Sequence, residues 1–157
     1  MGPERREGAL RLPSGRRIAL VAARYNAEIV EGLLEGALAA LRRQGIADSA
    51  MVIVRVPGAW ELPLAVRAML ERAECAAAVA LACVLRGETE HFRLVVEQSS
   101  HGLMRASLDT GKPVGNGILA VERREQALVR SAPGPSNRGA EAALAALELA
   151  DLLERLE

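Results

Sequence analysis

The chain has 157 residues, of which 50% are hydrophobic and 25% charged, enough for one domain with a full core and too short for two comfortable ones. Twenty Lys and Arg residues balance twenty Asp and Glu residues, so no basic excess exists to hold nucleic acid or an anionic membrane. The N-terminus is charged where a signal peptide would be apolar, and the longest uncharged apolar run, Ala76 to Leu85, is about half of what a bilayer requires. We therefore expect a cytoplasmic protein with no nucleic-acid or membrane partner.

The first half of the chain predicts two strands, each followed by a helix. The apolar run over residues 17–23 shows little alternation, which is typical of a strand covered on both faces, and residues 51–56 form a second strand that ends at Pro57 and Gly58. Asn26 is expected to N-cap a helix that ends at Gly45, and a second helix is expected over about residues 61–73.

The second half repeats the alternation of strand and helix. Strands are expected over residues 77–85 and 114–121, the latter weakened by glycines, helices over 89–110 and 122–130, and a last helix capped by Ser136 or Asn137. This alternation predicts an α/β fold, a three-layer α/β/α sandwich with a four-stranded parallel sheet in the flavodoxin-like order 2-1-3-4. The last helix is rich in alanine and is expected to pack closely against a neighbour, in the same chain or in another.

Aromatic residues make up only 2% of the chain, and each of the three is expected in a loop after a strand. Tyr25, Trp60 and Phe92 follow the first, second and third strands. In parallel sheets ligands bind beyond the carboxyl ends of the strands, so the three rings indicate a binding crevice. The alternative is that they merely fill gaps between loops.

The segment from Leu85 to His91 is a second candidate for binding chemistry. It joins the third strand to a helix N-terminus, whose free N–H groups favour an anion such as phosphate, and Thr89 can add a hydroxyl. His91 is expected to point into the same crevice and to move protons near pH 7, unless it is an ordinary surface residue. Cys75 and Cys83 are expected to be buried reduced thiols without a metal.

Four segments resemble the lumazine synthase family. They are Ala23–Asn26 followed by Leu33–Ala37, Val56–Pro63 (VPGAWELP), Val84–Phe92 (VLRGETEHF) and Asn137–Ala143 (NRGAEAA). The resemblance runs from about Arg17 to Leu153, in order and with family-like spacing. It implies a transferase of riboflavin biosynthesis that condenses 5-amino-6-(D-ribitylamino)uracil with 3,4-dihydroxy-2-butanone 4-phosphate to give 6,7-dimethyl-8-ribityllumazine, the penultimate step. Such a reaction needs proton transfers, so we expect no cofactor and no metal.

The resemblance also implies roles for individual residues. His91 would transfer protons and Tyr25 would stack on the pyrimidine ring. The ribityl chain would be held by Ala59, Trp60 and Glu61, the pyrimidine by backbone groups of Cys83, Val84 and Leu85, and the phosphate by Glu88 and Thr89. Arg130 and Asn116 would reach the pocket from an adjacent subunit.

The family further implies a homo-oligomer, either a pentamer or a sixty-subunit shell. Residues 1–16 would then form an N-terminal arm that pairs with a neighbouring subunit, because Ala9, Leu10 and Leu12 have no partner in a four-stranded sheet, and residues 17–157 would form the lumazine synthase domain. The chain departs from the family pattern at Asn116, where many members carry a ring, and at Ser131–Ser136, where a lysine is lost. Two alternatives are a shell protein without catalysis and a flavin- or lumazine-binding module without turnover.

Overall fold

A four-stranded parallel sheet forms the centre of the molecule. The computed structural model describes residues 1–157, and the strands hydrogen-bond in the order β2-β1-β3-β4. Their bounds are β1 Arg17–Ala23, β2 Met51–Val56, β3 Cys75–Leu85 and β4 Val114–Val121. This arrangement confirms the predicted fold class and strand order.

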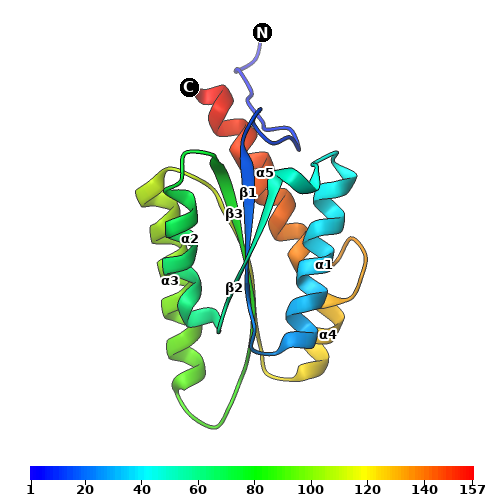
Figure 1. Cartoon of the computed structure of the whole chain (residues 1–157), viewed down its shortest axis with the longest axis vertical. Helices are drawn as coiled ribbons and strands as arrows, with labels where there is room; N and C mark the ends of the chain where they lie inside the picture. The colour runs from blue at the N-terminus through cyan, green and yellow to red at the C-terminus, as the bar shows by residue number, and fades with distance from the viewer.

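Five α-helices cover the two faces of the sheet (Figure 1). Their bounds are α1 Ala27–Arg43, α2 Leu62–Leu70, α3 His91–Thr110, α4 Arg124–Ser131 and α5 Arg138–Leu156. α2 and α3 lie on one face, and α1, α4 and α5 lie on the other. Each face has its own buried apolar cluster, so β1 and β3 are covered on both sides, as their unbroken apolar sequences predict. No helix has the length and apolarity needed to cross a membrane.

Several predicted boundaries shift because tertiary contacts set them. β3 begins at Cys75, two residues before the predicted start, because Cys75 is in register with Arg17 at the start of β1. α2 ends at Leu70 rather than near residue 73, and the Lys112 ammonium donates hydrogen bonds to the carbonyls of Leu70 (2.6 Å) and Arg72 (2.9 Å). α3 and α4 each begin two residues later than expected.

The alanine-rich α5 packs against α1, β3 and β4 of its own chain. A glycine of β4 makes this approach possible, since a Cβ on Gly115 would lie 2.2 Å from the carbonyl oxygen of Ala142 on α5. A Cβ on Gly117 would instead crowd β3, 2.8 Å from the carbonyl oxygen of Ala80. Glycine therefore weakens the strand in isolation but allows close packing of the helix. Asn137, not Ser136, caps α5 by accepting from the Ala140 N–H (3.0 Å).

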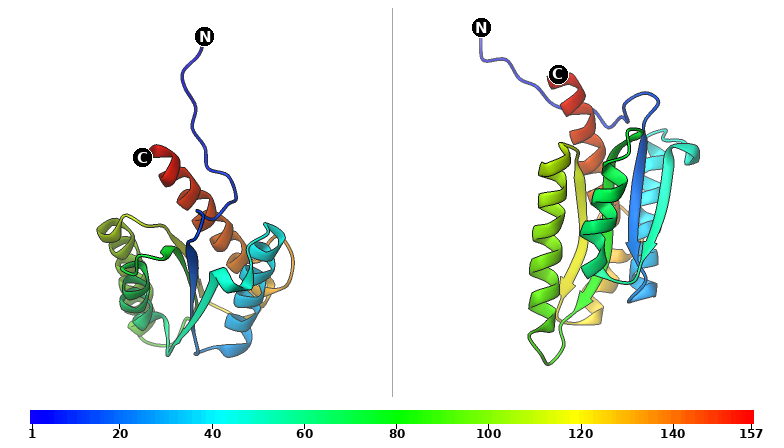
Figure 2. Two further views of the ribbon diagram at one scale, coloured as in Figure 1. Left: turned by 45° about the horizontal axis from the view of Figure 1, so that its top comes forward. Right: turned by 60° about the vertical axis from the view of Figure 1, so that its left-hand side comes forward.

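The N-terminal arm is anchored on the end of α5 near both termini, away from the carboxyl ends of the strands (Figure 2). The Ala9 N–H donates to Asp151 Oδ2 (2.7 Å), and the Arg11 guanidinium donates to Asp151 Oδ1 (3.1 Å). Leu12 packs on the α5 side of the core. As expected, this stretch has no partner in the four-stranded sheet; its contacts within the chain are with helix α5.

Candidate active site

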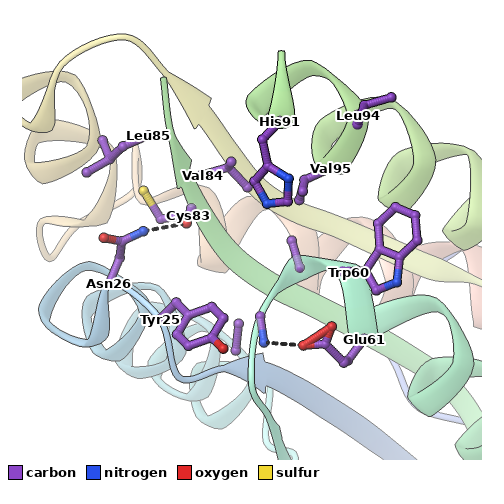
Figure 3. Close-up of a pocket in the computed structure, with 13 residues that line it drawn as sticks. Tyr25, Asn26, Trp60, Glu61, Cys83, Val84, Leu85, His91, Leu94 and Val95 are labelled. Carbon is purple, nitrogen blue, oxygen red and sulfur yellow. Dashed lines mark hydrogen bonds between the residues drawn. The ribbon is translucent and has the colours of Figure 1, made fainter. Parts of the chain in front are cut away.

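A cavity of about 690 Å³ opens at the carboxyl ends of β1 and β3, where the order of strands reverses direction (Figure 3). Its walls come from the turns after β1 and β2, the end of β3 and the first turns of α3. The lining residues are Ala23, Tyr25, Asn26, Gly58, Ala59, Trp60, Glu61, Cys83, Val84, Leu85, His91, Leu94 and Val95.

The turn from β1 to α1 supplies Tyr25 and Asn26. Asn26 occupies the N-cap position of α1 as predicted, but its side chain does not cap the helix. Its amide instead donates to the carbonyl oxygen of Cys83 (2.7 Å). The Tyr25 ring is 66% exposed and turned toward the cavity, so its face is free to meet a ligand.

The turn from β2 to α2 supplies Gly58, Ala59, Trp60 and Glu61. Glu61 Oε1 accepts from the Gly58 N–H (3.1 Å), which fixes the carboxylate and leaves Oε2 to accept from a ligand. A Cβ on Gly58 would lie 2.6 Å from Cδ2 of Tyr25, so glycine is required for the ring to rest against this turn. The Trp60 side chain is 59% exposed and stands at the other side of the cavity.

The end of β3 forms the remaining wall. Burial raises the pKa of the Cys83 thiol above its usual value, with Arg124 opposing the shift, so the thiol is protonated at neutral pH. A protonated thiol is a poor nucleophile, so Cys83 contributes backbone and packing rather than covalent chemistry. The backbone carbonyl of Cys83 is already occupied by Asn26.

His91 is the first residue of α3, and its ring faces the cavity across from Glu61 (Figure 3). Its backbone N–H donates to Thr89 Oγ1 (3.3 Å), which holds the start of the helix. The imidazole itself has no hydrogen-bond or ion-pair partner in the chain. It is therefore available to give or take a proton from a molecule in the cavity.

The structure brings most of the predicted site residues together in this one cavity. Tyr25, Ala59, Trp60, Glu61, Cys83, Val84, Leu85 and His91 all line it. The four others lie outside it: Glu88 and Thr89 in the exposed loop before α3, Asn116 on β4 and Arg130 on α4.

Two of these outlying residues are held by local contacts. Asn116 Oδ1 accepts from the Ile118 N–H (3.0 Å), and the Arg130 guanidinium donates to the Gln126 carbonyl (2.9 Å). The expectation that all three rings line the crevice is wrong for Phe92. Its ring is half-buried and lies under the Arg86 guanidinium, 5.3 Å from the ring centroid.

Sequence reasoning missed Ala23, Asn26, Gly58, Leu94 and Val95 as lining residues. Leu94 and Val95 follow His91 by three and four residues, so helical spacing could have found them. Nothing in the sequence pairs Asn26 with Cys83. No group of three or more His, Cys, Asp or Glu side chains is placed to hold a metal ion.

Comparison with known proteins gives one consistent result. The family model described as 6,7-dimethyl-8-ribityllumazine synthase matches residues 15–154. A protein of that name from Stenotrophomonas maltophilia (strain R551-3) is 48% identical over 150 residues, which cover 96% of this chain and 97% of the relative. Proteins of the same name from Xanthomonas campestris pv. campestris (strain B100) and Xanthomonas oryzae pv. oryzae (strain PXO99A) are 47% and 46% identical with the same coverage.

Proposed function

Because the chain belongs to the 6,7-dimethyl-8-ribityllumazine synthase family, transferases of riboflavin biosynthesis, we propose that it condenses 5-amino-6-(D-ribitylamino)uracil with 3,4-dihydroxy-2-butanone 4-phosphate. The product is 6,7-dimethyl-8-ribityllumazine, with one phosphate and two waters released. The observation that carries the proposal is the meeting of Tyr25, Glu61 and His91 on one cavity.

The cavity suits a flat heterocycle with a polyhydroxylated tail. The Tyr25 ring offers a stacking face for the pyrimidine, and backbone groups of Cys83, Val84 and Leu85 border the same space. On the far side, Ala59, Trp60 and Glu61 would hold the ribityl chain. Glu61 Oε2 is an acceptor for its hydroxyl groups, since Oε1 is held by the Gly58 N–H.

The chemistry consists of additions and eliminations that need protons at defined atoms. The 5-amino nitrogen attacks the ketone carbon, and loss of water leaves an imine. Elimination of phosphate then leaves an enol, which tautomerises to a new carbonyl beside a methyl group. The ribitylamino nitrogen closes the second ring on this carbonyl with loss of a second water. His91, the first residue of α3, would transfer protons between the nitrogen and oxygen atoms that react in these steps.

Holding both substrates in register lowers the barrier as well. Fixed orientation can supply about 7–11 kcal/mol in favourable cases, and one acid–base group adds roughly two to four orders of magnitude in rate. Orientation of the substrates therefore lowers the activation barrier more than His91 does, so the reaction should be slower, but not abolished, without His91.

The phosphate of the second substrate would bind near the loop before α3, at the backbone N–H groups of Glu88 and Thr89. Arg130 and Asn116 would complete the pocket from an adjacent subunit, since neither lines the cavity of its own chain. This requires a homo-oligomer, which we propose is a pentamer, alone or in a sixty-subunit shell, in the cytoplasm. The arm, residues 1–16, would pair with a neighbouring subunit, and light scattering would measure the assembly.

The test is to incubate the purified protein with both substrates and to follow lumazine fluorescence. Product formation at a rate above the uncatalysed reaction supports the proposal. Binding of lumazine without turnover would instead favour a binding module. Assembly without either activity would favour a shell protein that has lost catalysis.

A further inference from the structure

We propose that Asn26 is a positioning residue of the active-site cavity, which ties the β1–α1 turn to the end of β3 and so sets where Tyr25 stands. This inference rests on the function proposed above, because it assigns the residue a role in binding the uracil substrate. It does not place Asn26 among the groups that exchange protons with substrate.

The backbone of Asn26 is unusual. It is the sole non-glycine residue with positive φ, at φ 60° and ψ 49°, a left-handed conformation that asparagine tolerates better than most residues. Its carbonyl accepts from the N–H groups of Ile29 and Val30 (both 3.1 Å) and so begins α1. Helix initiation is thus done by the backbone, which leaves the side chain free for another contact.

That contact extends the pairing of β1 with β3. The register of the two strands ends at Ala22 and Leu81, so the Cys83 carbonyl, two residues farther along β3, no longer faces a β1 backbone donor. The Asn26 amide takes this place at 2.7 Å, across 57 residues of sequence. At the point where the cavity opens, a side-chain hydrogen bond therefore replaces the next backbone hydrogen bond between β1 and β3 (Figure 3).

The other side of the same turn is fastened to β2. The N–H groups of Arg24 and Tyr25 both donate to the Pro57 carbonyl (3.1 and 3.0 Å), and the Tyr25 ring rests against Gly58. Tyr25 thus lies between two anchors, one of backbone and one supplied by Asn26 alone. Without the amide donor the turn loses its β3 anchor and is held only by the hydrogen bonds to Pro57, which should then open more often.

Two variants separate the hydrogen bond from the backbone conformation. Asn26→Gly allows positive φ without an amide, and Asn26→Asp keeps the shape but places a carboxylate oxygen, which cannot donate, opposite the Cys83 carbonyl. We expect both to raise the KM for the uracil substrate roughly tenfold, about the loss of one hydrogen bond. We expect kcat and the KM for the phosphate-bearing substrate to change less than twofold, because no hydrogen bond joins Asn26 to His91 or to the loop before α3.

Hydrogen exchange without ligand gives a readout that does not depend on turnover. In Asn26→Gly the N–H groups of Arg24 and Tyr25 should exchange faster than in the unsubstituted protein, while those of β3 at Val79–Leu81 should not. A wild-type uracil KM and unchanged exchange in Asn26→Gly would overturn the inference and leave only a backbone role. If the unsubstituted protein forms no lumazine, the proposed function fails, whereas the exchange comparison still tests the anchor.

Discussion

At the scale of single residues, the cavity separates a proton-transfer group from the groups that bind. His91 reaches the cavity from the first turn of α3 with its ring unpaired, whereas Glu61 is held by the Gly58 N–H and Tyr25 by the fit of its ring against Gly58. A free imidazole can change its protonation during a reaction, while the fixed groups define where the substrate lies. The roles in proton transfer and in binding therefore follow from which side chains already have a partner within the protein.

We expect His91→Ala to lower turnover by roughly two to four orders of magnitude, because a positioned acid–base group is removed. Substrate affinity should change little, since the binding groups stay in place. Steady-state kinetics and equilibrium binding of the uracil substrate measure the two effects. His101→Ala is the matched control, an exposed histidine on the same helix that lines no part of the cavity. Unchanged turnover in His91→Ala would remove the residue from the mechanism.

Arg130 is predicted to bind the substrate phosphate across a subunit boundary, where its guanidinium fork matches a phosphate. Arg130→Ala should raise the KM for the phosphate-bearing substrate by at least about tenfold and leave that for the uracil nearly unchanged. Arg105→Ala, at an exposed arginine of α3 paired with Asp109, is the control. Equal effects of Arg130→Ala on both substrates would contradict the assignment.

At the scale of elements, one buried side chain joins the segments on the α1 side of the sheet. The Asn137 amide donates to the carbonyls of Gly32, Ser131 and Ala132 (each 3.0 Å), and its Oδ1 caps α5. α1, the end of α4 and the start of α5 therefore meet at a single residue that is 1% exposed. The small residues around it are required by this closeness: a Cβ on Gly36 would lie 2.1 Å from Asn137 Oδ1.

We expect Asn137→Ala to lower the free energy of unfolding by about 2–4 kcal/mol, because it removes a helix cap and leaves buried carbonyls without donors. Chemical denaturation followed by circular dichroism measures the change. Ser136→Ala, one residue earlier and exposed, should be neutral. If Asn137→Ala lowered the free energy of unfolding no more than Ser136→Ala does, water would have replaced the lost hydrogen bonds.

At the scale of the whole molecule, both chain termini lie at the end of the sheet away from the carboxyl ends of the strands (Figure 2), whereas the cavity lies at those carboxyl ends. A buried carboxylate organises the end with the termini. Asp151 on α5 is fully buried and accepts from the Ala9 N–H, from Arg155 (2.7 Å) and from Arg11 (3.1 Å). These bonds, the one from Ala9 first, hold the pKa of Asp151 below the ordinary aspartate value of 3.8. Glu154, 3.9 Å from the Arg11 guanidinium, is the other acidic group at this cluster.

The sign of the pH effect follows from that lowered pKa. A carboxylate with a lower pKa in the folded state stabilises the fold fully above pH 3.8, and this stability is lost as pH falls through the folded-state value. Asp151→Asn should therefore be less stable than the unsubstituted protein at pH 7, and the gap should close below pH 3.8. Denaturation at several pH values measures this, with Asp109→Asn on α3 as the control. A gap independent of pH would mean that the charge of Asp151 contributes nothing.

The order of the elements and most of the residues that line the cavity follow from the sequence alone. Buried parallel strands are read from unbroken apolar runs, and right-handed crossovers leave few strand orders. Parallel strands also bring their carboxyl ends to one edge. Residues at or just after the ends of successive strands, such as Tyr25, Trp60 and Val84, can therefore be predicted to meet without any knowledge of side-chain contacts.

The contacts between residues far apart in the chain could not be predicted, because they depend on how the elements pack. Asn26 is a residue type that commonly N-caps helices, yet its side-chain amide donates to the Cys83 carbonyl. This carbonyl is available because the pairing of β1 with β3 has already ended. The arm has the apolar pattern of an edge strand, yet Ala9 binds Asp151, 142 residues away. Local sequence specifies which groups need partners, whereas the partner is chosen by which elements pack together, and that depends on the whole fold.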